Sequence, residues 1–237
     1  MCTSKGGQKR EKQKHKMRRP ATRDGWIRRW KRSIIVIRDR ATTLRTDREM
    51  YRRYVNAISN NPRLDNSNEF FLLLQRMYIA HMLVALRTFD DTDLRSYSLH
   101  NLIKEILDNS TVITREWFVR RYRKSLAWAG DRDFSEHWGK GVYLSRQRLR
   151  ADLRAVRTAC RKVRTVVNKW IAHNARRRRA VQLTWGEVDN ALDTVYEVMA
   201  RYHLLIMRAQ WGGFDLRADW MEVFDVPWNT EAMHAKS

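Results

Sequence analysis

Residues 149–170 read LRADLRAVRTACRKVRTVVNKW, and their pattern predicts how the chain folds. Its apolar positions alternate steps of four and three residues without a miss: Leu149, Leu153, Val156, Cys160, Val163, Val167 and Trp170. This spacing puts all of them on one side of an α-helix, because residues three and four apart are neighbours on a helix surface. Five of the residues between them are arginine: Arg150, Arg154, Arg157, Arg161 and Arg164. The stretch therefore predicts one continuous helix with an apolar seam and a cationic face.

A second stretch, residues 188–209, repeats the alternation with Val188, Leu192, Val195, Met199, Tyr202, Ile206 and Ala209. It is preceded by Thr184 and Glu187, which have the spacing of a capping box. In a capping box each of the two side chains accepts a hydrogen bond from the backbone amide of the other residue. We therefore expect two long antiparallel helices, joined by residues 174–183.

The remaining sequence favours helices as well, because it holds only nine glycines and three prolines. Apolar spacing predicts a helix from Trp26 to about Ile58, whose Thr-rich middle could be broken, with a stop at Asn60-Asn61-Pro62. A helix from Glu69 to about Arg87 is apolar nearly all round, which predicts a buried helix at the centre of the bundle. A shorter helix covers residues 99–107.

The domain organisation expected from these patterns is one helical domain over residues 25–237, preceded by an arm. Residues 1–24 are rich in Lys, Arg and Gln and lack apolar periodicity, so they predict a basic disordered arm. The C-terminal tail carries four aromatic residues that we expect to fold back onto the bundle: Phe214, Trp220, Phe224 and Trp228. Residues 110–143 predict only one or two short helices, broken near Gly130 and Gly139.

The formal net charge of +22 comes from two segments. Residues 1–32 hold 13 Lys/Arg and 2 acids, residues 144–179 hold 13 Lys/Arg and 1 acid, and the rest of the chain is nearly neutral. Such segments attract phosphate backbones through counterion release, which favours RNA as a partner and leaves DNA open. A solvated helix face, an acidic partner protein and a membrane surface are the alternatives.

Cysteine usage and hydropathy indicate a cytoplasmic chain. Cys2 and Cys160 are too few for a disulfide framework, and no apolar stretch approaches the roughly 20 residues that span a bilayer. The first twenty residues have no apolar core of a signal peptide. The histidines show no metal-ligand spacing, so we expect neither a metal nor a cofactor.

The segment Asn168-Lys-Trp-Ile-Ala-His173 resembles the Arg-Asn-Lys-x-x-Ala-His signature of HEPN domains, specifically the abortive-infection branch of AbiU type. Three further segments resemble landmarks of that branch: Leu86–Asp91, Tyr97–Leu102 and Leu183–Asp189. The resemblance covers about residues 66–210. It implies a HEPN-like four-helix bundle with extra helices, a homodimer in which two copies of the motif face each other, and metal-independent RNA cleavage in active members.

The resemblance also implies roles for individual residues. His173 would act as general acid or base toward the ribose 2′-hydroxyl or the leaving oxygen, with Asn168 as an orienting hydrogen-bond partner. The side chain of Lys169 would place a positive charge near the phosphate in the transition state, and so would those of Arg176 and Arg177. The RNA-binding residues would be Arg164, Arg176, Arg177, Arg178 and Arg179.

The sequence departs from the family pattern at two places. The arginine of the signature falls at Val167, which belongs to the apolar seam, and the acidic residue two positions after the histidine is replaced by Ala175. Position 175 also lacks the tyrosine that accepts a nucleotidyl group in one HEPN branch. His173 flanks the seam, where a half-buried structural histidine is also expected.

Two other functions remain open at this point. The departure at Val167 favours a catalytically inactive module that binds nucleic acid through its basic segments. The arginine-rich face would equally suit an antitoxin-like partner of an acidic protein.

Overall fold

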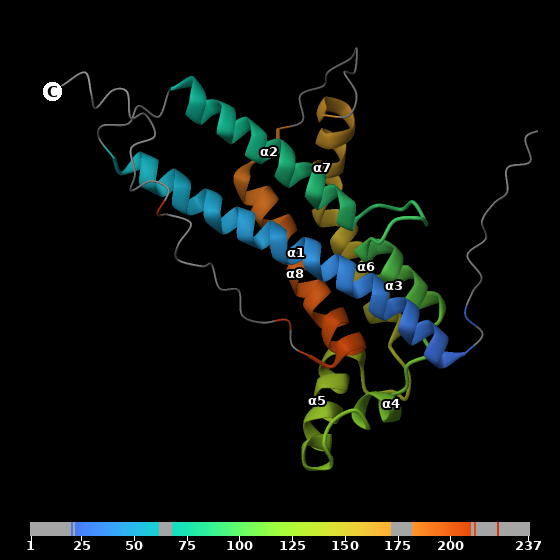
Figure 1. Cartoon of the computed structure of the whole chain (residues 1–237). Coiled ribbons are helices and arrows are strands. Elements are labelled where there is room, and N and C mark those ends of the chain that lie inside the picture. The colour runs from blue at the N-terminus through green and yellow to red at the C-terminus, as the bar shows by residue number, and fades with distance from the viewer. Residues whose placement is uncertain are drawn as a thin grey trace, which may run out of the picture.

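The computed structural model describes residues 20, 22–61, 68–171, 182–209, 211 and 222. Within these ranges the regular structure is helical, with no strand and one isolated bridge between Thr114 and Tyr143. The elements are α1 (Arg23–Ser59), α2 (Glu69–Phe89), α3 (Leu99–Asp108), α4 (Arg115–Val119), η1 (Lys124–Leu126), α5 (Ala127–Trp138), α6 (Arg146–Ala159), α7 (Arg161–Val166), η2 (Val167–Ile171) and α8 (Trp185–Met207) (Figure 1). The predicted all-α fold is confirmed.

The longest helix, α1, forms one side of the core. It runs unbroken from Arg23 to Ser59, so the break considered for its Thr-rich middle is absent. Thr22 caps it by accepting a hydrogen bond from the backbone N–H of Gly25 at 3.2 Å. Its apolar residues pack against α2, α3 and α8, and Trp30 and Ile34 are fully buried. The helix ends at Ser59, directly before the predicted stop.

The helix α2 lies beside α1 and not at the centre of the bundle (Figure 1). The prediction of a buried central helix is therefore wrong. Its fully buried side chains are confined to its C-terminal half. Tyr78, Ile79 and Ala85 are partly buried against the core, and several large apolar residues are exposed to solvent. Among these, Phe70, Leu73, Met77 and Val84 are between 42% and 60% exposed.

The length and hydropathy of α2 alone would allow it to cross a membrane, and among the described residues it is the only such helix. Only 17% of its most apolar window is buried. Its polar side chains serve contacts within this chain, since the His81 ring nitrogen Nε2 lies 2.8 Å from the Asp47 carboxylate of α1.

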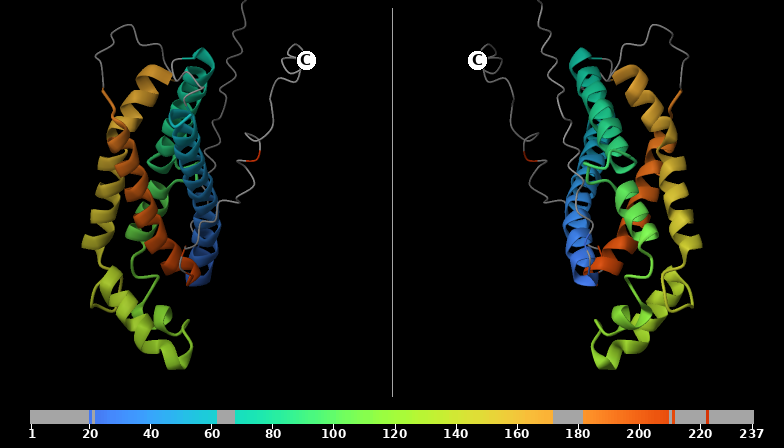
Figure 2. Two further views of the ribbon diagram at one scale, coloured as in Figure 1. Left: turned by 90° about the vertical axis from the view of Figure 1, so that its left-hand side faces the viewer. Right: turned by 90° about the vertical axis from the view of Figure 1, so that its right-hand side faces the viewer.

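The centre of the bundle is α8, which packs against α1, α2 and α6. Its predicted seam is confirmed from Val188 to Ile206, since Leu192, Val195, Met199 and Ile206 are all fully buried, whereas Ala209 lies beyond the end of the helix and is exposed. The capping box is present as predicted: Thr184 accepts from the backbone of Glu187, and the Glu187 carboxylate accepts from the backbone of Thr184. The side views show α6 and α7 on the opposite side of the bundle from α1 and α2, with α8 and α3 between them (Figure 2).

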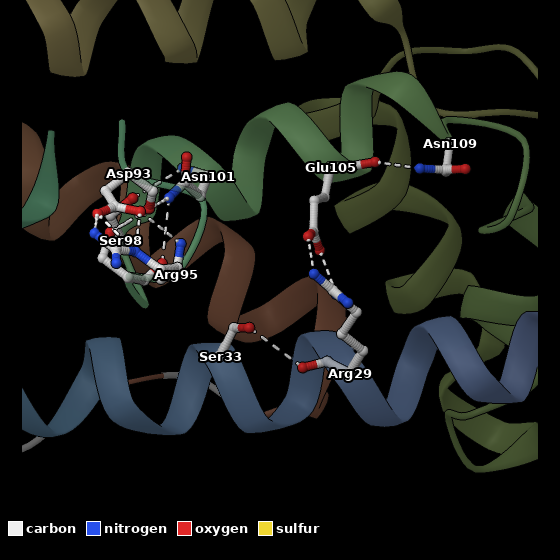
Figure 3. A network of polar contacts seen from close by, with 9 residues as sticks. Arg29, Ser33, Asp93, Arg95, Ser98, Asn101, Glu105 and Asn109 are labelled. Atoms are coloured by element: carbon white, nitrogen blue, oxygen red, sulfur yellow. Dashed lines mark hydrogen bonds and ion pairs between the residues drawn. The ribbon is translucent and has the colours of Figure 1, made fainter. Parts of the chain in front are cut away.

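A network of polar side chains fixes α3 against α1 (Figure 3). Arg29 of α1 donates two hydrogen bonds to the Glu105 carboxylate of α3, at 3.0 and 2.5 Å. The loop before α3 is tied to the helix, because the Asn101 amide donates to the backbone oxygen of Asp93 at 2.7 Å. The apolar face predicted for residues 99–107 is buried, so this short helix is confirmed.

Residues 110–143 form a lobe of short helices at one end of the bundle (Figures 1 and 2). The predicted break at Gly130 is absent, and this glycine lies inside α5 where a Cβ would come within 2.7 Å of the Tyr122 ring. The break at Gly139 is real. Its φ of 101° is a conformation that favours glycine and ends α5 there.

Two parts of the predicted organisation lie mostly outside the described residues. The basic arm is described only at Pro20 and from Thr22 on, and α1 begins at Arg23, within the range assigned to the arm. The four aromatic residues of the C-terminal tail lie outside the described ranges.

Candidate nucleic-acid interface

The seam of residues 149–167 faces the core, as predicted. Leu149, Val156, Cys160, Val163 and Val167 are all 3% exposed or less. The predicted single helix is interrupted once by a turn at Cys160, although the Arg164 N–H still donates to the Cys160 carbonyl at 2.9 Å. Burial raises the pKa of the Cys160 thiol to about 12, so this cysteine is an inert packing residue.

The motif begins in a π-helix, η2, which covers Val167–Ile171. A π-helix bonds each residue to the fifth one along the chain, and such wide turns are frequent at functional sites. The motif therefore begins in a backbone geometry that differs from the continuous α-helix expected from the apolar spacing.

Within the motif, Val167 and its two successors point to different surroundings. Val167 is 2% exposed and packs in the core, so an arginine at this position would enter an apolar environment. Asn168 and Lys169 are exposed, and the side chain of neither makes a hydrogen bond or ion pair with another described residue. Both are therefore accessible to a ligand. Their catalytic roles stay predictions.

His173 and the run Arg176–Arg179 lie outside the described residues. Their predicted roles as general acid or base and as RNA-binding residues therefore stay predictions.

Arg164, predicted to bind RNA, is paired with a buried acid. Its guanidinium donates to the Asp90 carboxylate, whose side chain is completely buried, whereas the Arg164 side chain is 32% exposed. The other oxygen of Asp90 lies 3.4 Å from Nδ1 of the buried His100. Burial, and next the nearby Arg157, lower the pKa of His100, which favours its neutral form. The Arg164 charge is therefore compensated inside the protein, and contact with RNA remains a prediction for it.

Four other arginines of this helix form what we call the arginine stripe: Arg150, Arg154, Arg157 and Arg161. They follow steps of four, three and four residues, so they share one side of α6 and α7. On a helix, the Cβ atoms of residues at this spacing are about 5–6 Å apart. All four are exposed, and none of their guanidinium groups has a hydrogen-bond or ion-pair partner among the described residues. The stripe is a row of uncompensated positive charge that leads toward η2.

The other side of the helix is neutralised. Asp152 accepts a hydrogen bond from Arg201 of α8 at 2.6 Å, and Lys162 pairs with Glu187, which lowers the pKa of that carboxyl. The helix therefore presents one cationic side to solvent and one ion-paired side to α8. In the part of the chain that the structure describes, no group of three His, Cys, Asp or Glu residues could hold a metal ion.

The described residues form an all-helical bundle, and the sequence Asn-Lys-x-x-Ala-His begins in its basic helix, which is the arrangement expected of a HEPN-type domain. The chain matches the AbiU2 family of HEPN domains over residues 30–222, and it belongs to that family. The match is wider than the resemblance read from the sequence and takes in most of α1. No significant match was found among curated proteins or among solved structures. Membership connects the chain with ribonuclease-like or abortive-infection-related roles.

Sequence reasoning missed several features near the motif. Asp90 and His100 lie in the segments Leu86–Asp91 and Tyr97–Leu102 that resemble the family, but the contacts of Asp90 with His100 and with Arg164 were not predicted. The signal that could have revealed their contact is weak, because Asp90 and Arg164 are 74 residues apart in the chain. The π-helix has no sequence signature that we recognise.

Proposed function

We propose that this protein acts on RNA as a metal-independent endoribonuclease of a defence or toxin-type system in the cytoplasm. The observation that carries the proposal is the arginine stripe, whose charge has no acidic partner among the described residues and which shares its helix with the HEPN motif. Arginines that a fold needs for stability are usually paired with acids, as Arg29 and Arg201 are here. A row of unpaired ones suits the phosphates of a polyanion.

The chemistry assigned to the motif needs only groups of this chain. His173 would take the proton of the ribose 2′-hydroxyl or give one to the leaving oxygen, because imidazole exchanges protons near neutral pH. Asn168 would orient the histidine or the phosphate by hydrogen bonding. Lys169, with Arg176 and Arg177, would stabilise the extra negative charge of the transition state, although lysine lacks the bidentate geometry of arginine.

A cleavage assay in EDTA tests this assignment. The wild-type protein should cut labelled single-stranded RNA without metal, and His173→Ala should reduce the rate at least about 100-fold, the scale of general acid–base catalysis. His137→Ala, at a half-buried histidine of α5 outside the motif, is the control and should keep wild-type activity. Equal activity of the wild type and His173→Ala would refute the assignment.

The competing proposal is a binding module with an inactive site, and the burial of Val167 supports it. Without the family arginine in place, the motif would lose a transition-state cation while the arginine stripe kept its affinity for RNA. This function predicts salt-sensitive RNA binding with no product formed by either protein of the cleavage assay.

We also propose a homodimer that uses the exposed face of α2. Phe70, Leu73, Met77, Ala80 and Val84 alternate steps of three and four residues, the pattern of a helix seam that packs on another helix. On this stripe the four larger side chains are exposed, and exposed apolar stripes of this kind mark protein interfaces. Because α2 contacts α7 and η2, a dimer through this helix would bring two motifs near each other.

Light scattering after size exclusion tests the dimer. The wild-type protein should have about twice the 28.5 kDa mass of the chain. Met77→Glu should convert it to a monomer, because a charge would be buried in the apolar stripe. Leu94→Glu makes the same kind of change at a residue that is 71% exposed in the loop after α2, and it should leave the dimer intact. A wild-type monomer would contradict this interface.

A further inference from the structure

A cleft lies between the C-terminal third of α1, the first half of α2 and the first turns of α8. Its volume is about 450 Å³, within the usual range for small-molecule sites. Its walls carry aromatic side chains from all three helices, among them Tyr51, Tyr78 and Trp185. The motif and the arginine stripe take no part in this cleft.

The three rings lie nearly parallel to one another. The Tyr51 and Tyr78 rings stack with centroids 3.7 Å apart and planes 8° apart. The Trp185 ring lies 5.9 and 6.0 Å from their centroids, inclined by 27° and 26°. A site for a quaternary ammonium group is an aromatic cage, in which rings face the roughly spherical cation from several directions. Near-parallel rings instead suit a flat ligand that extends the stack.

Polar groups at the cleft are available for the edge of such a ligand. The Gln75 amide, with two donors and one acceptor oxygen, has no partner among the described residues. The Trp185 side chain is 45% exposed, and its indole N–H forms no hydrogen bond within the described ranges. An amide and an indole N–H are the kind of groups that read the donors and acceptors on a nucleobase edge.

The charges at the cleft cancel, which decides between neutral and ionic ligands. Arg48 lies 2.9 Å from Asp189 and 2.7 Å from Asp193, and Arg52 pairs with Asp189 at 2.9 Å. Two arginines thus face two carboxylates. A phosphate would have to compete with the carboxylates for the arginines, and a cation would meet the arginines themselves. A neutral planar ligand meets neither obstacle.

We propose that this cleft binds one neutral nucleobase, stacked on Trp185 and hydrogen-bonded by Gln75. The base comes either from a free nucleoside or from an unpaired position of an RNA strand, since both offer the same flat ring. The site does not depend on RNA cleavage. It stands or falls independently of the function proposed for the motif.

Calorimetric titration of the full chain tests the proposal. The ligands are the four ribonucleosides, a short single-stranded RNA, and the same RNA with one abasic position. Stacking of a base on an aromatic residue contributes about 1–3 kcal/mol, so Trp185→Ala should weaken binding of the preferred nucleoside about tenfold or more. Trp128→Ala, at a tryptophan that is 63% exposed on α5, should leave that binding unchanged.

The second variant, Gln75→Ala, keeps the stack and removes the edge contacts. It should reduce the preference among the four nucleosides without changing the thermal midpoint of unfolding by more than a few degrees. If no free nucleoside binds, the two RNA strands are compared. An abasic position that weakens RNA binding to the wild-type protein, but not to Trp185→Ala, identifies a base within a strand as the ligand. Binding of neither kind, or binding that Trp185→Ala leaves unchanged, overturns the proposal.

Discussion

Replacing all four arginines of the stripe with glutamine should weaken binding of single-stranded RNA on the order of 10²–10³-fold at 0.1 M salt. Each phosphate neutralised by a cation gives a slope of roughly −0.7 in the plot of log affinity against log salt. Four contacts together contribute about −2.8 to this slope. The part of the RNA affinity that depends on them therefore changes by close to three powers of ten between 0.1 M and 1 M salt. The arginines are exposed and have no ion-pair partners within the described ranges, so the fold should keep its stability.

The matched control removes the same number of charges from arginines that are already paired: Arg38, Arg53, Arg95 and Arg120, which lie within ion-pair distance of Asp39, Glu49, Asp93 and Glu116. Both quadruple variants lower the net charge by four. Fluorescence anisotropy with a labelled RNA at several salt concentrations gives affinity and slope. An equal loss in both variants would show that net charge, and not the stripe, attracts RNA.

Replacing Arg164 with methionine should lower the free energy of unfolding by about 3–5 kcal/mol, the usual cost of removing one partner of a buried ion pair. The carboxylate of Asp90 is completely buried, and the remaining neighbour, His100, favours its neutral form. The variant would leave a negative charge in the core without a counter-charge. Urea unfolding followed by circular dichroism measures the difference.

Two comparisons separate this cause from loss of packing. Arg161→Met changes an exposed arginine on the same helix and should alter stability by no more than about 0.5 kcal/mol. The double variant Asp90→Asn/Arg164→Met removes both charges and should recover part of the loss, because the amide is neutral. A single variant as stable as the wild type would mean that Asp90 is protonated or hydrated in the native state.

Helix identity and the inner faces of α3, α6 and α8 could be predicted because each alternates apolar and polar residues with helical spacing. The position of α2 within the bundle could not be predicted. A helix that is apolar all round is compatible with a bundle centre and also with an edge whose outer face meets another chain, and the pattern is the same in both cases. The long uninterrupted α1 was obscured by its Thr-rich middle, where Thr42, Thr43 and Thr46 bond back to the carbonyls one turn earlier.

The candidate site was predictable only in part. Local sequence identifies the motif and the basic face, and it also places Val167 in the seam. Contacts between distant segments escape it, such as that of Asp90 with Arg164, and so does the assembly of the aromatic cleft from three helices. The π-helix changes the rotation between motif residues in a way that apolar spacing does not record.

The ion pairs between α1 and α8 have a consequence for synthesis of the protein. Arg48 and Asp193 are 145 residues apart, so the ion pair between α1 and α8 cannot form until these further residues have been made. At a translation rate of about 5–20 residues per second, this interval is on the order of 10 s. The motif precedes α8, so its helix would leave the ribosome before α8 is available to pack against α6. A nascent chain therefore passes through a period in which its cationic helix has been made but α8, the helix at the centre of the bundle, has not.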